Sequence, residues 1–465
     1  MKSPQRARSQ RMGPVSGSRL GRFIQERGTN QLLILGFLVI VIIGTLLLRL
    51  PIASAGPEPL GWMEALFTST SAVTVTGLTV VSTAGEISRF GQWVILGLMQ
   101  VGGAGFVAFS VLAFSLIGRR VSLQERFMVQ QTLGRHEMSG VVGLTQYVLA
   151  VTIGLESLGA AGLYLRWRGS MPDGQALYYA IFHAISAYCN AGFDLFAASE
   201  AGPYFGYGRD PITLGISGAL VIVGGLGVTV LYDLWRARFH HELSLHTRLT
   251  LLMTLLLTVV GVLVVNLDPN LHRAVGLDAS QAEAYVAGAF TAVSARTAGL
   301  TVLPLNLLEQ STQLILMVWM FIGAAPASMA GGVSTSTLAV IMVVVLATAR
   351  GDDQPVAYGR AIPHETLTKA VAVMTVSSVL VATVTLALVR LHSGDIFPVA
   401  FEVVSAFSNT GYSLGLTGQL GFLGRLLIAL TMFWGRLGPL TVVVALAERA
   451  QPNLVHYPEE PIILG

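Results

Sequence analysis

The chain has 465 residues, of which 53% are hydrophobic and 11% are charged. Soluble globular proteins carry about 25% charged residues, so this composition excludes an ordinary soluble domain and predicts a polytopic membrane protein. The formal net charge of +3 is small for this length, and we therefore expect no nucleic acid among its partners. Because Cys189 is the one cysteine, neither an intramolecular disulfide nor a multi-cysteine metal site can form.

The first 30 residues are strongly basic, with seven Lys or Arg and a single acidic residue. The apolar run at 31–50 follows them; it is long enough to cross a bilayer and lacks the cleavage pattern of a signal peptide. We expect an uncleaved first helix with its N-terminus in the cytosol, because short loops rich in Lys and Arg stay on the cytosolic side. Basic and acidic loops alternate later in the chain in the same sense.

Eight apolar stretches have about the length of a membrane span. They lie near 31–50, 93–117, 141–165, 212–231, 249–267, 313–346, 367–391 and 420–447. An even number of spans returns the C-terminus to the cytosol. The sequence therefore predicts a multi-pass protein of the cell membrane with both termini cytosolic.

Between alternate pairs of these stretches lies a shorter segment with the pattern Phe-x-x-x-Ser-Ala. The pattern begins at Phe67, Phe182, Phe290 and Phe401, and it is followed each time by a glycine, namely Gly77, Gly192, Gly299 and Gly411. These glycines are 115, 107 and 112 residues apart. The repetition predicts four tandem units, each composed of a span, a short helix, a glycine turn and a second span.

These units define the predicted domain organisation. After the basic segment 1–30 come repeat 1 at 31–118, a cytosolic connection at 119–140, repeat 2 at 141–238, repeat 3 at 247–349, repeat 4 at 363–448 and a cytosolic tail at 449–465. The expected fold class is an all-α polytopic membrane protein with four membrane–pore–membrane repeats around one central pore.

The short helices carry the chemistry. A helix that ends within the membrane leaves carbonyl groups unpaired, which is tolerated only where they face a cavity or protein. Four such ends around one cavity favour a cation, and glycine turns let carbonyls point at one axis, as in potassium filters. We expect K+ to be held by Val75, Thr76, Gly77, Asn190, Ala191, Gly192, Thr297, Ala298, Gly299, Asn409, Thr410 and Gly411. The alternative is that these small residues only pack helices together.

These motifs resemble the Trk/Ktr/HKT superfamily of potassium transporters over residues 31–447. Within it the chain is most similar to the membrane subunit of Ktr systems, KtrB, because the first span leads directly into the first short helix. The resemblance implies passage of K+ down its electrochemical gradient, often with Na+ as an activator. Relatives with serine at the first filter glycine favour Na+, so glycine in all four copies favours K+.

The same resemblance implies the partners. A homodimer in the lipid bilayer would be seated on a cytosolic ring of nucleotide-binding regulatory subunits of the KtrA type. ATP or ADP would then act only through that ring, and we expect no covalent cofactor. The tail 449–465 resembles the family's C-terminal segment and is expected either to dock on the cytosolic side or to fray.

The second span of each repeat contains a cluster of small residues, which we align as 102–105, 224–227, 331–334 and 435–438. In repeat 3 this span is overlong and interrupted by proline and glycine, which should break the helix. The resulting loop at membrane depth must line water or protein, and by resemblance it is the gating loop. Its expected residues are Gly323, Pro326, Ser328, Gly331, Gly332, Ser334 and Thr335. The alternative is a packing kink against a neighbouring helix.

Two charged residues complete the predicted site. Arg436 lies in the middle of the last span, where a guanidinium normally faces water or the bundle interior. It resembles the pore-facing arginine of the family and is expected to form a barrier below the filter, unless it pairs with a buried acid. Asp194, directly after the second filter segment, is expected either to concentrate cations at the outer mouth or to cap a turn.

The sequence thus predicts the ion-translocating subunit of a potassium uptake system, gated by an intramembrane loop. It does not predict an enzyme, because Glu156, Asp233 and Arg436 make no obvious catalytic set. The competing interpretation is an alternating-access cation symporter with broken helices at mid-membrane. Four parallel repeats argue against it, because symporters are usually built from two halves.

Overall fold

The structure, a computed structural model, describes residues 29–104, 141–196, 207–240, 242–326, 328–392 and 394–438. Most of the predicted basic segment 1–30 lies outside these residues, as do the connection 119–140 and the tail 449–465. The predictions made for those segments therefore remain predictions.

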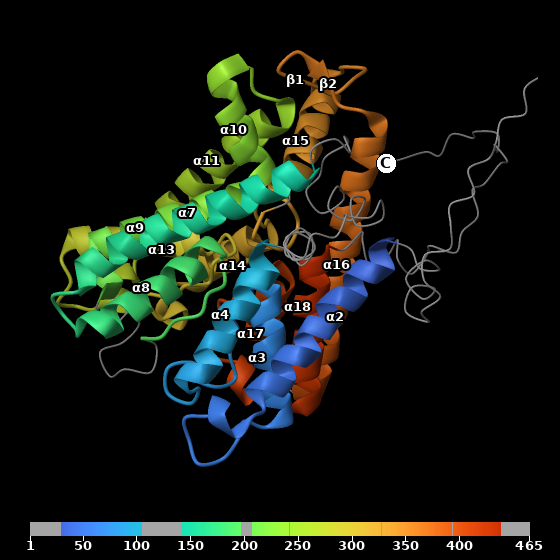
Figure 1. The fold of residues 1–465 in the computed structure, drawn as a ribbon. Helices are drawn as coiled ribbons and strands as arrows, with labels where there is room; N and C mark the ends of the chain where they lie inside the picture. Colours follow the sequence, from blue (N-terminus) through green and yellow to red (C-terminus); the bar gives the residue numbers. More distant parts are fainter. Residues whose placement is uncertain are drawn as a thin grey trace, which may run out of the picture.

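The described chain is built almost entirely from helices (Figure 1). The N-terminal half contains α2 (Thr29–Leu48), α3 (Trp62–Thr74), α4 (Arg89–Ala104), α7 (Val141–Trp167), α8 (Asp173–Tyr188), α9 (Pro211–Leu226) and α10 (Val228–His240). The C-terminal half contains α11 (Leu245–Asn266), α12 (Leu271–Val275), α13 (Gln281–Ser294), α14 (Gln310–Phe321), α15 (Thr335–Arg350), α16 (His364–His392), α17 (Ile396–Ser408) and α18 (Phe422–Leu437). The strands of the described ranges, β1 (Val356–Ala357) and β2 (Arg360–Ala361), form a small antiparallel hairpin between α15 and α16.

Three of the described helices are long and apolar enough to cross a membrane by themselves: α7 from Gln146 onward, α11 and α16. A fourth span would require α9 and α10 together, but these helices are bent by 92° at Gly227. The candidate span near 212–231 is therefore not one continuous helix, and only α9 and α10 together are long and apolar enough to form it. Gly227 has a φ of 80°, and a helix cannot continue through a positive φ.

The interruption predicted in the overlong stretch 313–346 is confirmed. Helix α14 ends at Phe321, α15 begins at Thr335, and the chain between them is not helical. We call this segment, Gly323–Ser334, the α14–α15 loop; Ala327 within it lies outside the described residues. Of the stretches predicted at 93–117 and 420–447, the structure describes only the parts that form α4 and α18.

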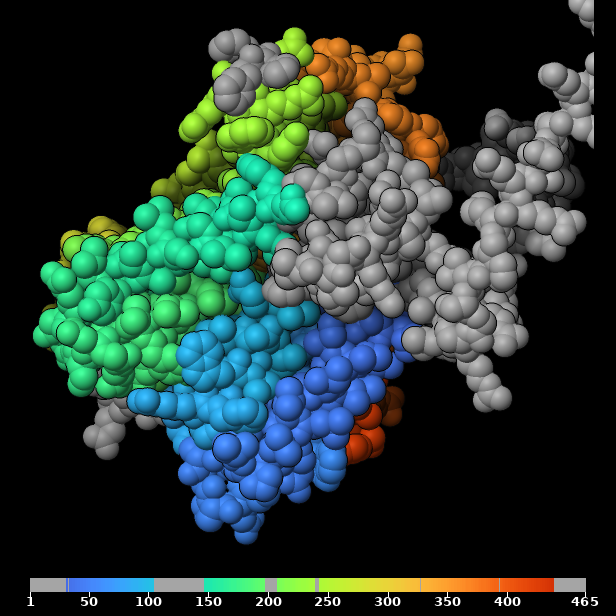
Figure 2. Space-filling model, in the orientation of Figure 1, coloured from blue at the N-terminus to red at the C-terminus, as the bar shows by residue number. Residues whose placement is uncertain are grey.

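The short helices α3, α8, α13 and α17 carry the Phe-x-x-x-Ser-Ala pattern and lie in the interior of the bundle. Their pattern residues are all buried, namely Phe67, Ser71, Ala72, Phe182, Ser186, Ala187, Phe290, Ser294, Ala295, Phe401, Ser405 and Ala406. Helix α2 shows the opposite arrangement: it lies on the surface in Figure 2, where Leu38, Ile42 and Leu46 are exposed. Hydroxyl groups inside and apolar side chains outside are what a protein surrounded by lipid requires.

Candidate functional site

The four short helices are all followed by turns with positive φ, and the third turn differs from the others at its first residue. Each is followed by a three-residue segment, and we number these glycine segments 1 to 4: Val75–Gly77, Asn190–Gly192, Thr297–Gly299 and Asn409–Gly411. The first residue of each segment has a φ of 58°, 57°, 114° or 54°, and the closing glycine has a φ of 83°, 72°, 63° or 92°. Positive φ at both positions ends each helix abruptly and makes glycine the natural third residue.

The serine of the pattern closes each of these turns. In every segment, the residue before the glycine donates its amide hydrogen to the carbonyl group of that serine over 2.7 to 2.9 Å. The serine hydroxyl adds a second bond in three segments: Ser186 donates to Phe193 over 2.8 Å, Ser294 donates to Leu300 over 3.0 Å, and Ser405 accepts from the Gly411 amide over 3.0 Å. The Ser71 hydroxyl has no partner within the described residues. Segment 1 is therefore held less firmly than the other three.

The four glycines form a closed ring. Each glycine lies against the carbonyl group of the residue before the glycine of the next segment, and the contacts join Gly77 to Ala191, Gly192 to Ala298, Gly299 to Thr410 and Gly411 to Thr76. A Cβ atom on Gly77 would lie 2.6 Å from the Ala191 oxygen, and a Cβ atom on Gly299 would collide with the Thr410 oxygen. Any side chain at these positions would thus displace a backbone carbonyl from its place in this structure. The ring brings four segments that are far apart in the sequence to one axis.

Two asparagine side chains hold glycine segments 2 and 4 in place through hydrogen bonds. Asn409 donates from Nδ2 to the Thr76 hydroxyl over 2.8 Å and to the Met432 carbonyl over 2.9 Å. Asn190, with its amide nitrogen turned inward, donates to the Ala187 carbonyl over 3.0 Å and to the Val221 carbonyl over 3.2 Å. Val221 and Met432 occupy the same position, three residues before a glycine of the second helix. Glycine segments 2 and 4 are therefore anchored in the same way.

The second helices pack on the ends of the short helices through glycine. A Cβ atom on Gly102, Gly224 or Gly435 would collide with the carbonyl oxygen of Val73, Tyr188 or Phe407, respectively. In each pair the carbonyl belongs to the residue four positions before the glycine of the ring. These contacts explain why the first small residue of each cluster is glycine.

The third cluster was aligned wrongly. Gly102, Gly224, Gly323 and Gly435 each lie 13 residues after the first residue of α4, α9, α14 or α18, whereas Gly331 lies 21 residues after the first residue of α14. Gly323 also follows the C-cap of α14, as the other clusters close their helices. Spacing and position both make Gly323 the counterpart in the third unit, and Gly331 belongs to the inserted loop.

The α14–α15 loop contacts the ends of the other helices. Its Ala325 amide donates to the Gly225 carbonyl of α9 over 3.0 Å. A Cβ atom on Gly331 would collide with Oδ1 of Asn409, and one on Gly332 would lie 3.1 Å from Cα of Ser408. The loop therefore lies directly against glycine segment 4 and the end of α17, and Ser334 caps the start of α15 by accepting from the Thr337 amide.

Arg436 joins the loop to two helices. From α18 it donates through Nη1 to the Met329 carbonyl of the loop over 2.5 Å, and through Nη2 to the carbonyl groups of Gly102 and, over 3.1 Å, Gly103 at the end of α4. Its partners are thus backbone carbonyls, and none of the ion pairs between described residues involves it. We find no support among these residues for the alternative of an ion pair with a buried acid.

Asp194 is engaged in the protein. Its Oδ1 lies 2.8 Å from Nε2 of His183 and accepts from the Phe196 amide over 2.7 Å, and its side chain is 11% exposed. These contacts fit the turn-capping alternative better than a free charge at a mouth. His183 packs against the Phe196 ring and contacts the Tyr179 carbonyl, so it does more than fill the core.

Three buried charged residues near the ring were missed by the sequence analysis as parts of the site. Glu402 on α17 is fully buried, and its Oε1 accepts from Ser413 and from the Thr417 amide. Arg296 directly precedes glycine segment 3, is 8% exposed and reaches the Thr254 carbonyl over 3.3 Å. Glu156 on α7 accepts from Gln100 of α4 over 2.9 Å. A charged residue inside an apolar or pattern segment was the available signal.

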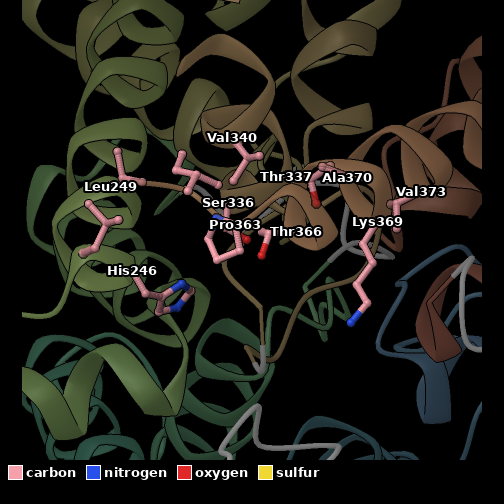
Figure 3. Close-up of a pocket in the computed structure, with 12 residues that line it drawn as sticks. His246, Leu249, Ser336, Thr337, Val340, Pro363, Thr366, Lys369, Ala370 and Val373 are labelled. Atoms are coloured by element: carbon pink, nitrogen blue, oxygen red, sulfur yellow. The ribbon is translucent and has the colours of Figure 1, made fainter. Parts of the chain in front are cut away.

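A cavity of about 310 Å³ lies beside the helix that follows the loop (Figure 3). Ser336, Thr337 and Val340 from the start of α15 line one side, and residues of α11 and α16, among them Leu249 and Ala370, line the others. The lining is largely apolar. The cavity leaves room for movement at the start of α15, directly after the α14–α15 loop.

Fold and site together define a helical membrane protein in which four glycine segments meet at one point. The sequence matches the TrkH family, described as cation transport protein, over residues 23–457. The chain belongs to this family, which is one of transporters and not of enzymes, and the resemblance seen in the sequence is confirmed.

Individual relatives cover nearly the whole chain. The Ktr system potassium uptake protein B of Bacillus subtilis is 37% identical over 94% of this chain and 96% of its own length. The potassium/sodium uptake protein NtpJ of Enterococcus hirae is 33% identical over 94% of this chain and 97% of its own length. The crystal structure of the potassium transporter TrkH from Vibrio parahaemolyticus has the same fold, with a TM-score of 0.68 and 19% identity over 88% of this chain and 84% of that one.

Proposed function

We propose that this chain is the ion-translocating subunit of a potassium uptake system. The observation that carries the proposal is the glycine ring, in which four carbonyl-bearing turns are held at one axis by contacts that admit no side chain. Carbonyl groups in such a ring replace the hydration shell of K+. Relatives named as potassium uptake proteins over nearly their full length support the same assignment.

In this proposal the chain is four membrane–pore–membrane repeats around one pore, and the twelve residues of the glycine segments are its selectivity filter. The shared helix ends, the common serine bond and the equivalent contacts of Gly102, Gly224 and Gly435 support fourfold pseudosymmetry. The C-terminal ends of the short helices add partial negative charge around the ion. Glycine segments 1 to 4 would then be the four walls of a single K+ pathway.

The α14–α15 loop is the proposed gate, and Arg436 is its latch. Three hydrogen bonds from one guanidinium tie the loop to α4, and they oppose any movement of the loop away from Met329's present position. A positive charge at this place would also repel cations. Replacement of Arg436 would therefore free the loop and remove the positive charge at the same time.

The remaining parts of the proposal rest on family membership. The protein would lie in the cell membrane with cytosolic termini, form a homodimer and sit on a cytosolic ring of nucleotide-binding subunits. ATP or ADP would act through that ring, Na+ would be an activator, and no covalent cofactor would take part.

Rubidium-tracer uptake into vesicles that contain the purified chain tests the proposal, with K+ or Na+ added as competitor and with the regulatory ring present and absent. We expect K+ to compete at much lower concentration than Na+. Equal competition would contradict a K+ filter, and absence of uptake in both conditions would contradict the function. An alternating-access symporter would instead show uptake that saturates with a coupling ion and counterflow of the tracer.

A further inference from the structure

Two of the four glycine segments are tied to their own short helix by a side-chain contact in addition to the serine bond. We call this contact, which spans the turn, a bracket. In segment 2, His183 of α8 reaches over the turn to Asp194, with Nε2 and Oδ1 2.8 Å apart. In segment 4, Glu402 of α17 reaches over the turn to Ser413, whose hydroxyl donates to Oε1 over 2.9 Å. The two helix residues, His183 and Glu402, are fully buried, and their partners lie just after the ring glycine in the sequence.

The two brackets are equivalent in position. His183 and Glu402 each follow the pattern phenylalanine and lie nine residues before the ring glycine. Asp194 and Ser413 each lie two residues after it. Glu402 also accepts from the Thr417 amide over 3.0 Å, so it orders a further turn beyond the bracket.

The other two segments lack this bracket within the described residues. Threonine follows the pattern phenylalanine in both. The Thr68 hydroxyl of α3 has no partner in that part of the chain, and the Thr291 hydroxyl of α13 donates to Ala287 of its own helix over 2.8 Å. Because the ring runs 1–2–3–4, the bracketed segments 2 and 4 face each other across the axis, and so do segments 1 and 3.

We infer that His183 and Glu402 are positioning residues for ion selection, each fixing the C-terminal end of its glycine segment. This inference rests on the proposed function of the ring as a K+ filter. The bracketed segments act as two rigid walls, and they keep the carbonyl groups of Ala191 and Thr410 at the separation that suits K+. Without the brackets these carbonyl groups can close around the smaller Na+.

The test compares Glu402→Leu with Glu402→Gln in vesicle uptake of rubidium, with K+ and Na+ as competitors. Leucine removes the acceptor, whereas glutamine keeps an oxygen at the same place. We expect the ratio of Na+ to K+ concentrations needed for half-inhibition to fall about two- to tenfold in the leucine variant, which is the effect of losing one ordinary hydrogen bond. The glutamine variant should restore most of the ratio.

Thr68→Val is the matched control, because it changes the equivalent residue of an unbracketed segment and should leave the ratio unchanged. If the leucine variant does not fold, Ser413→Ala removes one donor from the same bracket and should lower the ratio by a smaller factor. Thermal unfolding of every variant separates lost packing from changed selectivity.

Wild-type selectivity in both Glu402→Leu and Ser413→Ala would overturn the inference, and so would an equal loss in Thr68→Val. A wild-type chain that itself shows no preference for K+ would instead contradict the proposed function. The two failures are therefore distinguishable in one set of measurements.

Discussion

The glycine segments and the α14–α15 loop lie against each other but are held in opposite ways. The segments are fixed by a repeated backbone bond of 2.7 to 2.9 Å and by contacts so close that a Cβ atom would meet a carbonyl group. The loop packs closely against Asn409 at Gly331 but makes few hydrogen bonds to other helices: Ala325 and Met329 donate to Gly225 and Gly224 of α9, and Arg436 of α18 donates to Met329. Beside the helix that follows the loop there is a cavity.

This difference suggests a division of labour. Close-packed elements are rigid, whereas an element held by few bonds can adopt a second arrangement. Ion selection requires the first property and gating requires the second. The four predictions below would break or sharpen this contrast.

The largest effect should follow the replacement of a ring glycine by a residue with a side chain. For Gly299→Ser, overpacking costs about 1–3 kcal/mol and the left-handed backbone about 1–2 kcal/mol. Rubidium uptake should therefore fall at least about 30-fold. Gly415→Ser is the matched control, because Gly415 has a φ of 92° but nothing within 4 Å of its Cβ position. Normal uptake by the Gly299 variant would remove the ring from the pathway.

The second effect should follow release of the latch. Arg436→Gln removes the charge and most of the bonds that join α18, α4 and the loop. Since a bond from a charged donor contributes about 1.5–3 kcal/mol, basal uptake should rise about tenfold. Arg425→Gln on the same helix is the control, because the Arg425 side chain donates to the Gly418 carbonyl and makes no hydrogen bond to the loop or to α4 among the described residues. Reduced uptake at normal protein yield would show that Arg436 supports the pathway instead of closing it.

A smaller effect should follow filling of the cavity. Ala370→Leu places extra volume against the start of α15, and it should lower uptake about two- to threefold if α15 moves with the loop, as overpacking of about 1 kcal/mol or less would do. Val371→Leu, on the exposed side of the same helix, should have no effect. Equal uptake in both variants would indicate that the loop moves without α15.

The smallest effect concerns segment 1. Val75 has a φ of 58° and a ψ of 49°, a conformation that a β-branched residue adopts only under strain. Asparagine occupies the equivalent positions 190 and 409, so Val75→Asn should raise the free energy of unfolding by about 1 kcal/mol. Thermal unfolding measures the gain, and the reverse change Asn190→Val should lower stability. A less stable Val75→Asn variant would mean that valine packing outweighs the backbone strain.

Much of the architecture could be predicted because its causes are local. Low charge and long apolar runs indicate a membrane protein, and the pattern Phe-x-x-x-Ser-Ala marks the short helices because the phenylalanine, serine and alanine are each buried. Proline and glycine between 323 and 334 predicted the loop correctly. The bend at Gly227 was missed because the cluster Gly224-Gly225-Leu226-Gly227 also fits close helix packing, and the sequence does not show which glycine takes a positive φ.

Long-range contacts could not be predicted in the same way. Glu402 lies nine residues before the ring glycine and Ser413 two residues after it. Their contact depends on how the chain turns between them, which no sequence periodicity shows. The partners of Arg436 come from positions 102, 103 and 329. An arginine within an apolar span indicated a functional role, but only the fold shows which carbonyl groups accept its hydrogen bonds.

Crystals of the protein grown in rubidium salt offer the most direct test of the central claim. Anomalous difference density should appear on the axis of the glycine ring, within coordination distance of the carbonyl groups of Thr76, Ala191, Ala298 and Thr410. Rubidium density elsewhere in the membrane region, with none inside the ring, would contradict the account.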